Sequence, residues 1–166
     1  MAHFAKVEEK QDPTGFTSDT HWIVTEVLVV GNDIPTAAGP LGENDMHVDG
    51  ETWCNNRWGG TWKQTSYNNN FRGLYAGLGY RWNPDINRFV PPQPYASHTY
   101  NSSTHEWNAP VAYPAAYQFT NDAGETHYYC AVWSEENLRW EAHPEMSEGN
   151  IVHRYWDPSS STWIDI

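Results

Sequence analysis

The chain has 166 residues, a length that fits one domain or two very small ones. Its formal net charge is −12 and its nine lysines and arginines form no basic stripe, which argues against a nucleic-acid partner. No apolar stretch approaches the roughly 18 residues that a membrane-spanning helix needs, so we expect no membrane association. Aromatic residues make up 15% of the chain, and glycine, proline, asparagine and threonine recur throughout, which favours short strands and tight turns.

The N-terminal part, residues 1–80, is predicted to be a β region. Two strands are expected, at His3 to Glu8 and Trp22 to Val30, joined by a long turn. The continuous apolar run 27–30 at the end of the second strand is typical of a strand covered on both faces. Residues 31–50 contain several glycines and prolines without periodicity and are predicted to form a long loop.

One short helix is possible in this region, at residues 51–58. Glu51 would place an acidic side chain in its first turn, Arg57 would place a basic one in its last, and two glycines follow as a stop signal. Residues 61–67 then alternate in the manner of a strand.

The second part, residues 81–166, is organised by a repeat. An aromatic residue is followed by Asn, Asp or Ser, then by five residues, then by another aromatic residue. In a hairpin with a four-residue loop, positions i and i+7 lie opposite each other on one face, and Asn, Asp or Ser suits the start of a type I turn. Four aromatic-clamped hairpins are therefore predicted, with these pairs: Trp82 and Phe89, Tyr100 and Trp107, Trp133 and Trp140, Trp156 and Trp163.

Proline-rich stretches at 90–95 and 108–114 separate these hairpins. Because proline cannot donate a ladder hydrogen bond, such stretches are expected to be extended edges or linkers. The predicted fold class is therefore all-β, a series of antiparallel hairpins with cross-strand aromatic pairs and at most one short helix.

The two cysteines, Cys54 and Cys130, are expected to be free. The first residues lack a charged segment followed by an apolar one, so no secretory signal is expected and the chain would stay in a reducing compartment. Free thiols packed among aromatic residues are the favoured interpretation.

A metal site is not predicted, because the eight histidines show no metal-ligand spacing. Asn44, Asp45, His47 and Asp49 could in principle offer alternate ligands to Ca²⁺. The favoured interpretation is a loop with solvated carboxylates, since no twelve-residue loop centred on glycine and ending in Glu is present.

No catalytic residue or cofactor is predicted either. Nucleophile-elbow, phosphate-loop and zinc-protease patterns are missing from the sequence, and the two glycines of Tyr75–Tyr80 suit a strand that enters a hairpin. The aromatic residues have another use, because tryptophan and tyrosine on a β face can hold sugar rings. We treat the eight paired aromatic residues as a candidate contact surface, with core packing, subunit burial and sugar binding as its possible roles.

Four segments of the chain resemble a set of small proteins encoded by marine cyanophages and related ocean phages: Ala38–Asp45, Gly59–Asn68, Tyr75–Tyr80 and Pro92–Ser97. These relatives are mostly uncharacterised or described as virion or tail-fibre-like proteins. The resemblance spans nearly the whole chain, and it implies a phage origin more firmly than a role.

The expected function is that of a structural or accessory protein of the phage particle, on head, tail or fibre, located in the virion after synthesis in the host cytoplasm. Its expected partners are other phage structural proteins and further copies of itself. The alternative is an adhesin that binds a glycan of the host surface. An intracellular modulator of host metabolism is a third possibility.

Overall fold

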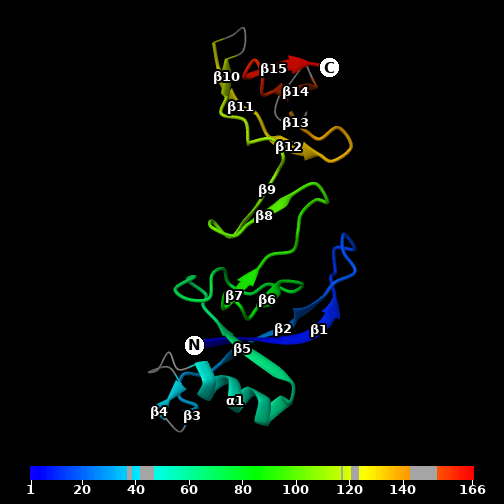
Figure 1. Cartoon of the computed structure of the whole chain (residues 1–166). Coiled ribbons are helices and arrows are strands. Elements are labelled where there is room, and N and C mark those ends of the chain that lie inside the picture. Colours follow the sequence, from blue (N-terminus) through cyan, green and yellow to red (C-terminus); the bar gives the residue numbers. More distant parts are fainter. Residues whose placement is uncertain (37–38, 42–46, 117, 121–123, 143–152) are drawn as a thin grey trace. The chain divides into compact units, whose positions relative to one another are not determined.

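The computed structural model describes residues 1–36, 39–41, 47–116, 118–120, 124–142 and 153–166 (Figure 1). These residues form antiparallel hairpins and sheets, which confirms the all-β prediction. The chain divides into two compact units: unit 1 is Met1–Pro92 and unit 2 is Gln93–Ile166. This boundary lies after the first aromatic hairpin, whereas the sequence placed it before that hairpin, at 80/81. The reason is long-range pairing, because Trp22 pairs with Trp82 and joins the hairpin to the N-terminal sheet.

Unit 1 is built on a five-stranded antiparallel sheet. Its strands are, in spatial order, β5 (Thr61–Thr65), β1 (Ala2–Gln11), β2 (Thr20–Val30), β6 (Arg81–Asn83) and β7 (Arg88–Val90). The strands expected at 3–8, 22–30 and 61–67 are present, and β1 is longer than predicted. The strand expected at Tyr75–Tyr80 is wrong, because these residues form a turn in which Tyr80 donates its N–H to the Gly77 carbonyl.

Both faces of this sheet carry a core. Side chains alternate between the two faces along β1, so that Ala2 and Phe4 enter one cluster and Ala5 and Val7 enter the other. One cluster holds Ala2, Phe4, Val30, Leu41, Cys54 and Trp62, and the other holds Ala5, Val7, Val24, Ala76, Trp82 and Phe89. The predicted coverage of residues 27–30 on both faces is wrong at Val29, which is 54% exposed.

The helix α1 (His47–Trp58) packs against β5 and beside the two-residue strands β3 (Pro35–Thr36) and β4 (Gly39–Pro40) (Figure 1). It begins at His47 and not at Glu51, so the predicted loop 31–50 contains both a short hairpin and the first turn of the helix. Gly50 explains the difference. Glycine is a poor helix former, but a Cβ here would lie 2.4 Å from the ring of Phe4, so only glycine lets the helix approach the sheet.

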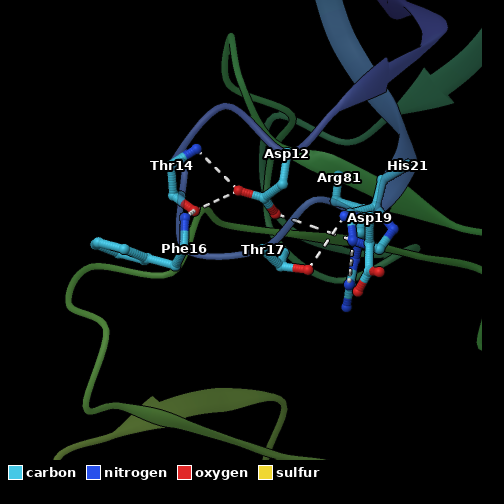
Figure 2. A network of polar contacts seen from close by, with 7 residues as sticks. All are labelled: Asp12, Thr14, Phe16, Thr17, Asp19, His21 and Arg81. Carbon is cyan, nitrogen blue, oxygen red and sulfur yellow. Dashed lines mark hydrogen bonds and ion pairs between the residues drawn. The ribbon is translucent and has the colours of Figure 1, made fainter.

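The long turn between β1 and β2 is held by its own side chains (Figure 2). The Asp12 carboxylate accepts hydrogen bonds from the backbone N–H of Thr14, at 2.8 Å, and from the Thr14 hydroxyl. Thr14 and Thr17 in turn accept from the backbone N–H groups of Phe16 and Asp19. These are the local bonds that make Asp and Thr common turn residues, and they leave the exposed Phe16 ring pointing away from the network (Figure 2).

Unit 2 consists of two separate hairpins and a four-stranded sheet. The hairpins are β8 (Thr99–Asn101) with β9 (Glu106–Asn108) and β10 (Gln118–Thr120) with β11 (Thr126–Tyr128). The sheet has the order β12 (Ala131–Ser134), β13 (Arg139–Ala142), β14 (Arg154–Asp157) and β15 (Thr162–Asp165). The β10–β11 hairpin lacks the aromatic repeat and was not predicted.

All four predicted aromatic hairpins form with the predicted partners opposite each other. The paired rings lie 5.0 to 5.6 Å apart, within the range of favourable aromatic contact. The residue after the first aromatic also acts as expected of a turn. Asn83, Asn101, Ser134 and Asp157 each accept a hydrogen bond from a backbone N–H two or three residues later.

The two cysteines are free thiols, as predicted. Cys54 is fully buried in α1, in the same cluster as Trp62, and burial raises its pKa to about 12. Cys130 is exposed, so the predicted packing of both thiols among aromatic residues is wrong for Cys130.

Candidate functional site

The structure separates the eight predicted contact residues into two groups. Four of them are buried within their own unit and cannot meet a partner: Trp82, Phe89, Trp133 and Trp156. Tyr100, Trp107, Trp140 and Trp163 are partly exposed. Two hairpins therefore place one aromatic residue in a core and its partner near the surface, namely Trp133 with Trp140 and Trp156 with Trp163. The first hairpin buries both of its aromatic residues, and the second leaves both partly exposed. The interpretation of all eight as a contact surface therefore narrows to four.

Two of these four, Trp107 and Trp140, line one cavity of unit 2, with a volume of about 650 Å³. We call it the aromatic groove. Its lining consists of His98, residues 107–113 and Trp140. Its size lies within the roughly 300–1,000 Å³ that small-ligand sites occupy.

The Trp140 ring is fixed by three contacts. It packs on Trp133 across the hairpin at 5.3 Å, and the Tyr113 ring lies 5.0 Å away at an interplanar angle of 71°. Its indole nitrogen donates to the Val111 carbonyl oxygen at 2.9 Å. This last bond ties the proline-rich stretch to β13, and the buried Pro114 anchors the same stretch one residue after Tyr113.

Tyr113 is a groove residue that the sequence analysis missed. It lies outside the aromatic repeat, and it is 57% exposed although its ring contacts Trp140. A signal was available, because Tyr113 lies in a proline-rich stretch that cannot form a regular ladder, and such connecting stretches run over the surface.

At His98, the groove adjoins a clamp between the turn that precedes β8 and the β12–β13 hairpin. Ser97 donates its backbone N–H to Glu135 at 2.9 Å and its hydroxyl to the same carboxylate at 2.6 Å. The indole nitrogen of Trp133 donates to Glu135 as well, at 2.9 Å. These hydrogen bonds from Ser97 and Trp133 hold the pKa of Glu135 below its ordinary value.

His98 itself is buried between two aromatic rings, with Tyr95 at 5.1 Å and Trp133 at 5.5 Å. Burial lowers the pKa of His98, and the nearby Glu135 carboxylate opposes this shift only in part. The imidazole is therefore neutral at neutral pH, and a neutral imidazole can both donate and accept a hydrogen bond. Neither His98 nor its clamp was singled out in the sequence, because Ser97 and Glu135 are far apart in the chain.

The described residues that line the groove include no Asp, Glu, Lys or Arg. The groove therefore offers aromatic faces together with amide, imidazole and carbonyl groups. Such a surface can hold a ligand that is apolar on one side and polar on its edges.

Within the described residues, no group of three or more His, Cys, Asp or Glu side chains is placed to hold a metal ion. Of the residues weighed as Ca²⁺ ligands, Asn44 and Asp45 lie outside the described residues, and His47 and Asp49 belong to the first turn of α1. No helix in the described part of the chain is long and apolar enough to span a bilayer.

Comparison with protein-family models, with curated proteins and with solved structures finds no match to this chain. What can be said of its function therefore depends on its own residues.

Proposed function

We propose that the chain is a non-enzymatic structural or accessory protein of a marine tailed-phage particle, and that it acts by contact through unit 2. The observation that carries the contact role is the uneven burial of this unit. Among its described residues only a few side chains are buried, while large apolar ones are exposed: Tyr113, Tyr128, Val132, Leu138 and Ile166. Unit 1 exposes large apolar side chains as well, among them Phe16, Trp58 and Tyr67, but it also buries two core clusters. Exposed apolar side chains on a unit with so small a core of its own are typical of a protein that meets another surface. The phage origin is supported by the resemblance of the four segments named above.

The sheet of unit 1 is covered on its faces and at its outer strands, and for this reason we assign the contact role to unit 2. The two core clusters cover both faces of this sheet. Its outer strands are occupied too. Gln64 of β5 donates its N–H to the Glu51 carboxylate and its carbonyl accepts from Arg72, and Phe89 of β7 donates its N–H to the Arg72 carbonyl. Side chains and backbone that cover a sheet edge prevent another strand from adding there.

The proposal is tested on purified particles of a phage whose genome encodes the chain. We expect the protein to co-purify with intact particles at a fixed stoichiometry, measured by quantitative mass spectrometry. Its presence in infected-cell extract but not in banded particles would overturn the proposal and favour an intracellular role.

A matched pair of exposed valines tests the assignment to unit 2. Val132→Asp, on β12, is expected to reduce the copy number per particle, because it places a charge on the proposed contact surface. Val29→Asp, on β2 of unit 1, makes the same change at an exposed strand position and is expected to leave the copy number unchanged. The reverse result would place the contact in unit 1.

A host-surface adhesin is a second candidate, which the aromatic groove favours. In that case the surface that unit 2 meets includes a glycan.

A further inference from the structure

We infer that the aromatic groove is a binding site for a neutral oligosaccharide, held mainly against Tyr113 and Trp140. This inference rests on the proposed contact role of unit 2 and gives that contact a ligand class. Three features of the groove carry it: the arrangement of its rings, the kind of polar groups beside them, and its rigidity.

The rings form a corner. Tyr113 and Trp140 meet nearly edge to face, at 71°, so their faces point in different directions beside one cavity. A pyranose ring has apolar C–H groups on its flat sides and hydroxyl groups around its rim. One sugar ring can therefore lie on the exposed Tyr113 face while its neighbour meets Trp140, and Trp107 lines the same cavity from β9.

The polar groups suit hydroxyls better than charges. Asn108 offers an amide group, and His98 offers a neutral imidazole. Pro110 has no backbone N–H, so the stretch that lines the groove has one donor fewer than it has carbonyl acceptors. No carboxylate, ammonium or guanidinium group lies among the described lining residues, so a charged ligand would lose hydration without gaining an ion pair. The chain's net charge of −12 repels acidic polysaccharides in addition. A neutral glycan is the ligand class that remains.

The groove is held in shape before any ligand arrives. Trp140 is tied to Val111 by its indole hydrogen bond, and the Ser97–Glu135 clamp holds the segment that carries His98 against the β12–β13 hairpin. A site that is already ordered loses little conformational entropy on binding, which allows a small contact area to give measurable affinity.

The experiment applies the full-length protein to an array of neutral oligosaccharides built from glucose, galactose, mannose and N-acetylglucosamine, beside sialylated and sulfated glycans and a proline-rich peptide. Hits are titrated by calorimetry. We expect binding to one or more neutral glycans and none to the acidic ones. Tyr113→Ala should weaken binding roughly tenfold or more, as truncation of an anchoring aromatic residue does, with the fold retained because this side chain is largely exposed.

Tyr67→Ala is the matched control, since Tyr67 is an exposed tyrosine of unit 1 outside the groove, and it should bind as the unmodified chain does. Equal losses in Tyr113→Ala and Tyr67→Ala, binding to acidic glycans only, binding to the proline-rich peptide only, or no binding at all would each overturn the inference. The particle experiment separates this failure from that of the proposed function. A chain that is present in particles but binds no glycan keeps its structural role, and a chain that binds neutral glycans but is absent from particles loses it.

Discussion

At the scale of single residues, the aromatic hairpins share a feature that their aromatic spacing did not reveal. In each of them the fifth residue after the first aromatic has a positive φ, between 50° and 62°, although none is glycine: Asn87, His105, Leu138 and Ser161. This residue is the last one of the four-residue loop, and its left-handed conformation lets the chain enter the second strand. Asparagine tolerates it best, because its short polar side chain can hydrogen-bond to the local backbone, and leucine is the least suited of the four because its side chain has no polar group to do so.

Leu138→Gly is therefore expected to stabilise unit 2. The left-handed conformation costs an ordinary residue roughly 1–2 kcal/mol, and the greater freedom of glycine in the unfolded chain offsets part of this, which leaves a gain of about 0.5–1 kcal/mol. Little burial is lost, since Leu138 is 50% exposed. Urea unfolding measures the change. Leu138→Ala is the control, because alanine keeps the strain, and an equal gain for both variants would contradict this explanation.

The Ser97–Glu135 clamp predicts a pH dependence. The folded-state pKa of Glu135 is depressed, so the clamp stabilises fully above the unfolded-state pKa of about 4.3 and is lost as the pH falls through the folded-state value. We expect the indole N–H resonance of Trp133, which donates to Glu135, to shift over this acidic range in an NMR titration.

Glu135→Gln should abolish that acidic shift of the Trp133 resonance. Glu136→Gln, the same change at an exposed neighbour, should keep it. A Trp133 resonance that titrates alike in both variants would show that another group is responsible.

At the scale of elements, the outer edge of β5 is covered by two charged side chains, Glu51 and Arg72, which bond to its backbone. Glu51 of α1 accepts from the Gln64 N–H at 2.8 Å, ion-pairs with Lys63 at 3.3 Å and contacts Arg72 directly. Arg72 donates to the Gln64 carbonyl at 3.0 Å and lies over the Trp82 ring at 4.9 Å. Helix, edge strand and the first aromatic hairpin thus share one buried set of contacts.

Glu51→Gln is expected to destabilise unit 1 strongly. It removes the negative charge opposite Arg72, whose side chain is only 8% exposed, and an unpaired buried charge costs about 3–5 kcal/mol. Chemical denaturation of unit 1 measures this cost. Glu8→Gln makes the same change in a surface pair with Lys10 and should leave stability unchanged within error. A small effect of Glu51→Gln would mean that water replaces the carboxylate.

Prediction from the sequence succeeded for elements whose partner lies close in the chain. The four aromatic hairpins were found with their pairs because both strands and the turn fit in eight residues. The start of α1 was missed because Gly50 is favoured by its contact with Phe4, which is distant in sequence. The groove was found only in part for the same reason. Trp107 and Trp140 belong to the repeat, but what joins them is the stretch that carries Tyr113.

At the scale of the whole molecule, the two units differ in how they are stabilised. Unit 1 has two core clusters that include fully buried Phe4 and Cys54. Unit 2 relies on aromatic pairs, indole hydrogen bonds and the Ser97–Glu135 clamp, with few fully buried side chains among its described residues. Because apolar burial supplies most of the stability of a folded domain, unit 2 is expected to open first.

The two cysteines can report on this order, since the boundary at Pro92 places one of them in each unit. Cys54 is fully buried and burial raises its pKa to about 12, so an alkylating reagent reaches its thiolate only when unit 1 opens. We expect amide hydrogen exchange in β12–β15 to accelerate at urea concentrations where Cys54 is still protected from pulsed iodoacetamide, as measured by peptide mass spectrometry. Cys130, which is exposed, should be labelled without urea. Cys130→Ser should leave the protection of Cys54 unchanged. Loss of Cys54 protection at the same urea concentration as exchange in β12–β15 would mean that the two units unfold as one cooperative body, with unit 2 supported by contacts beyond its own small core.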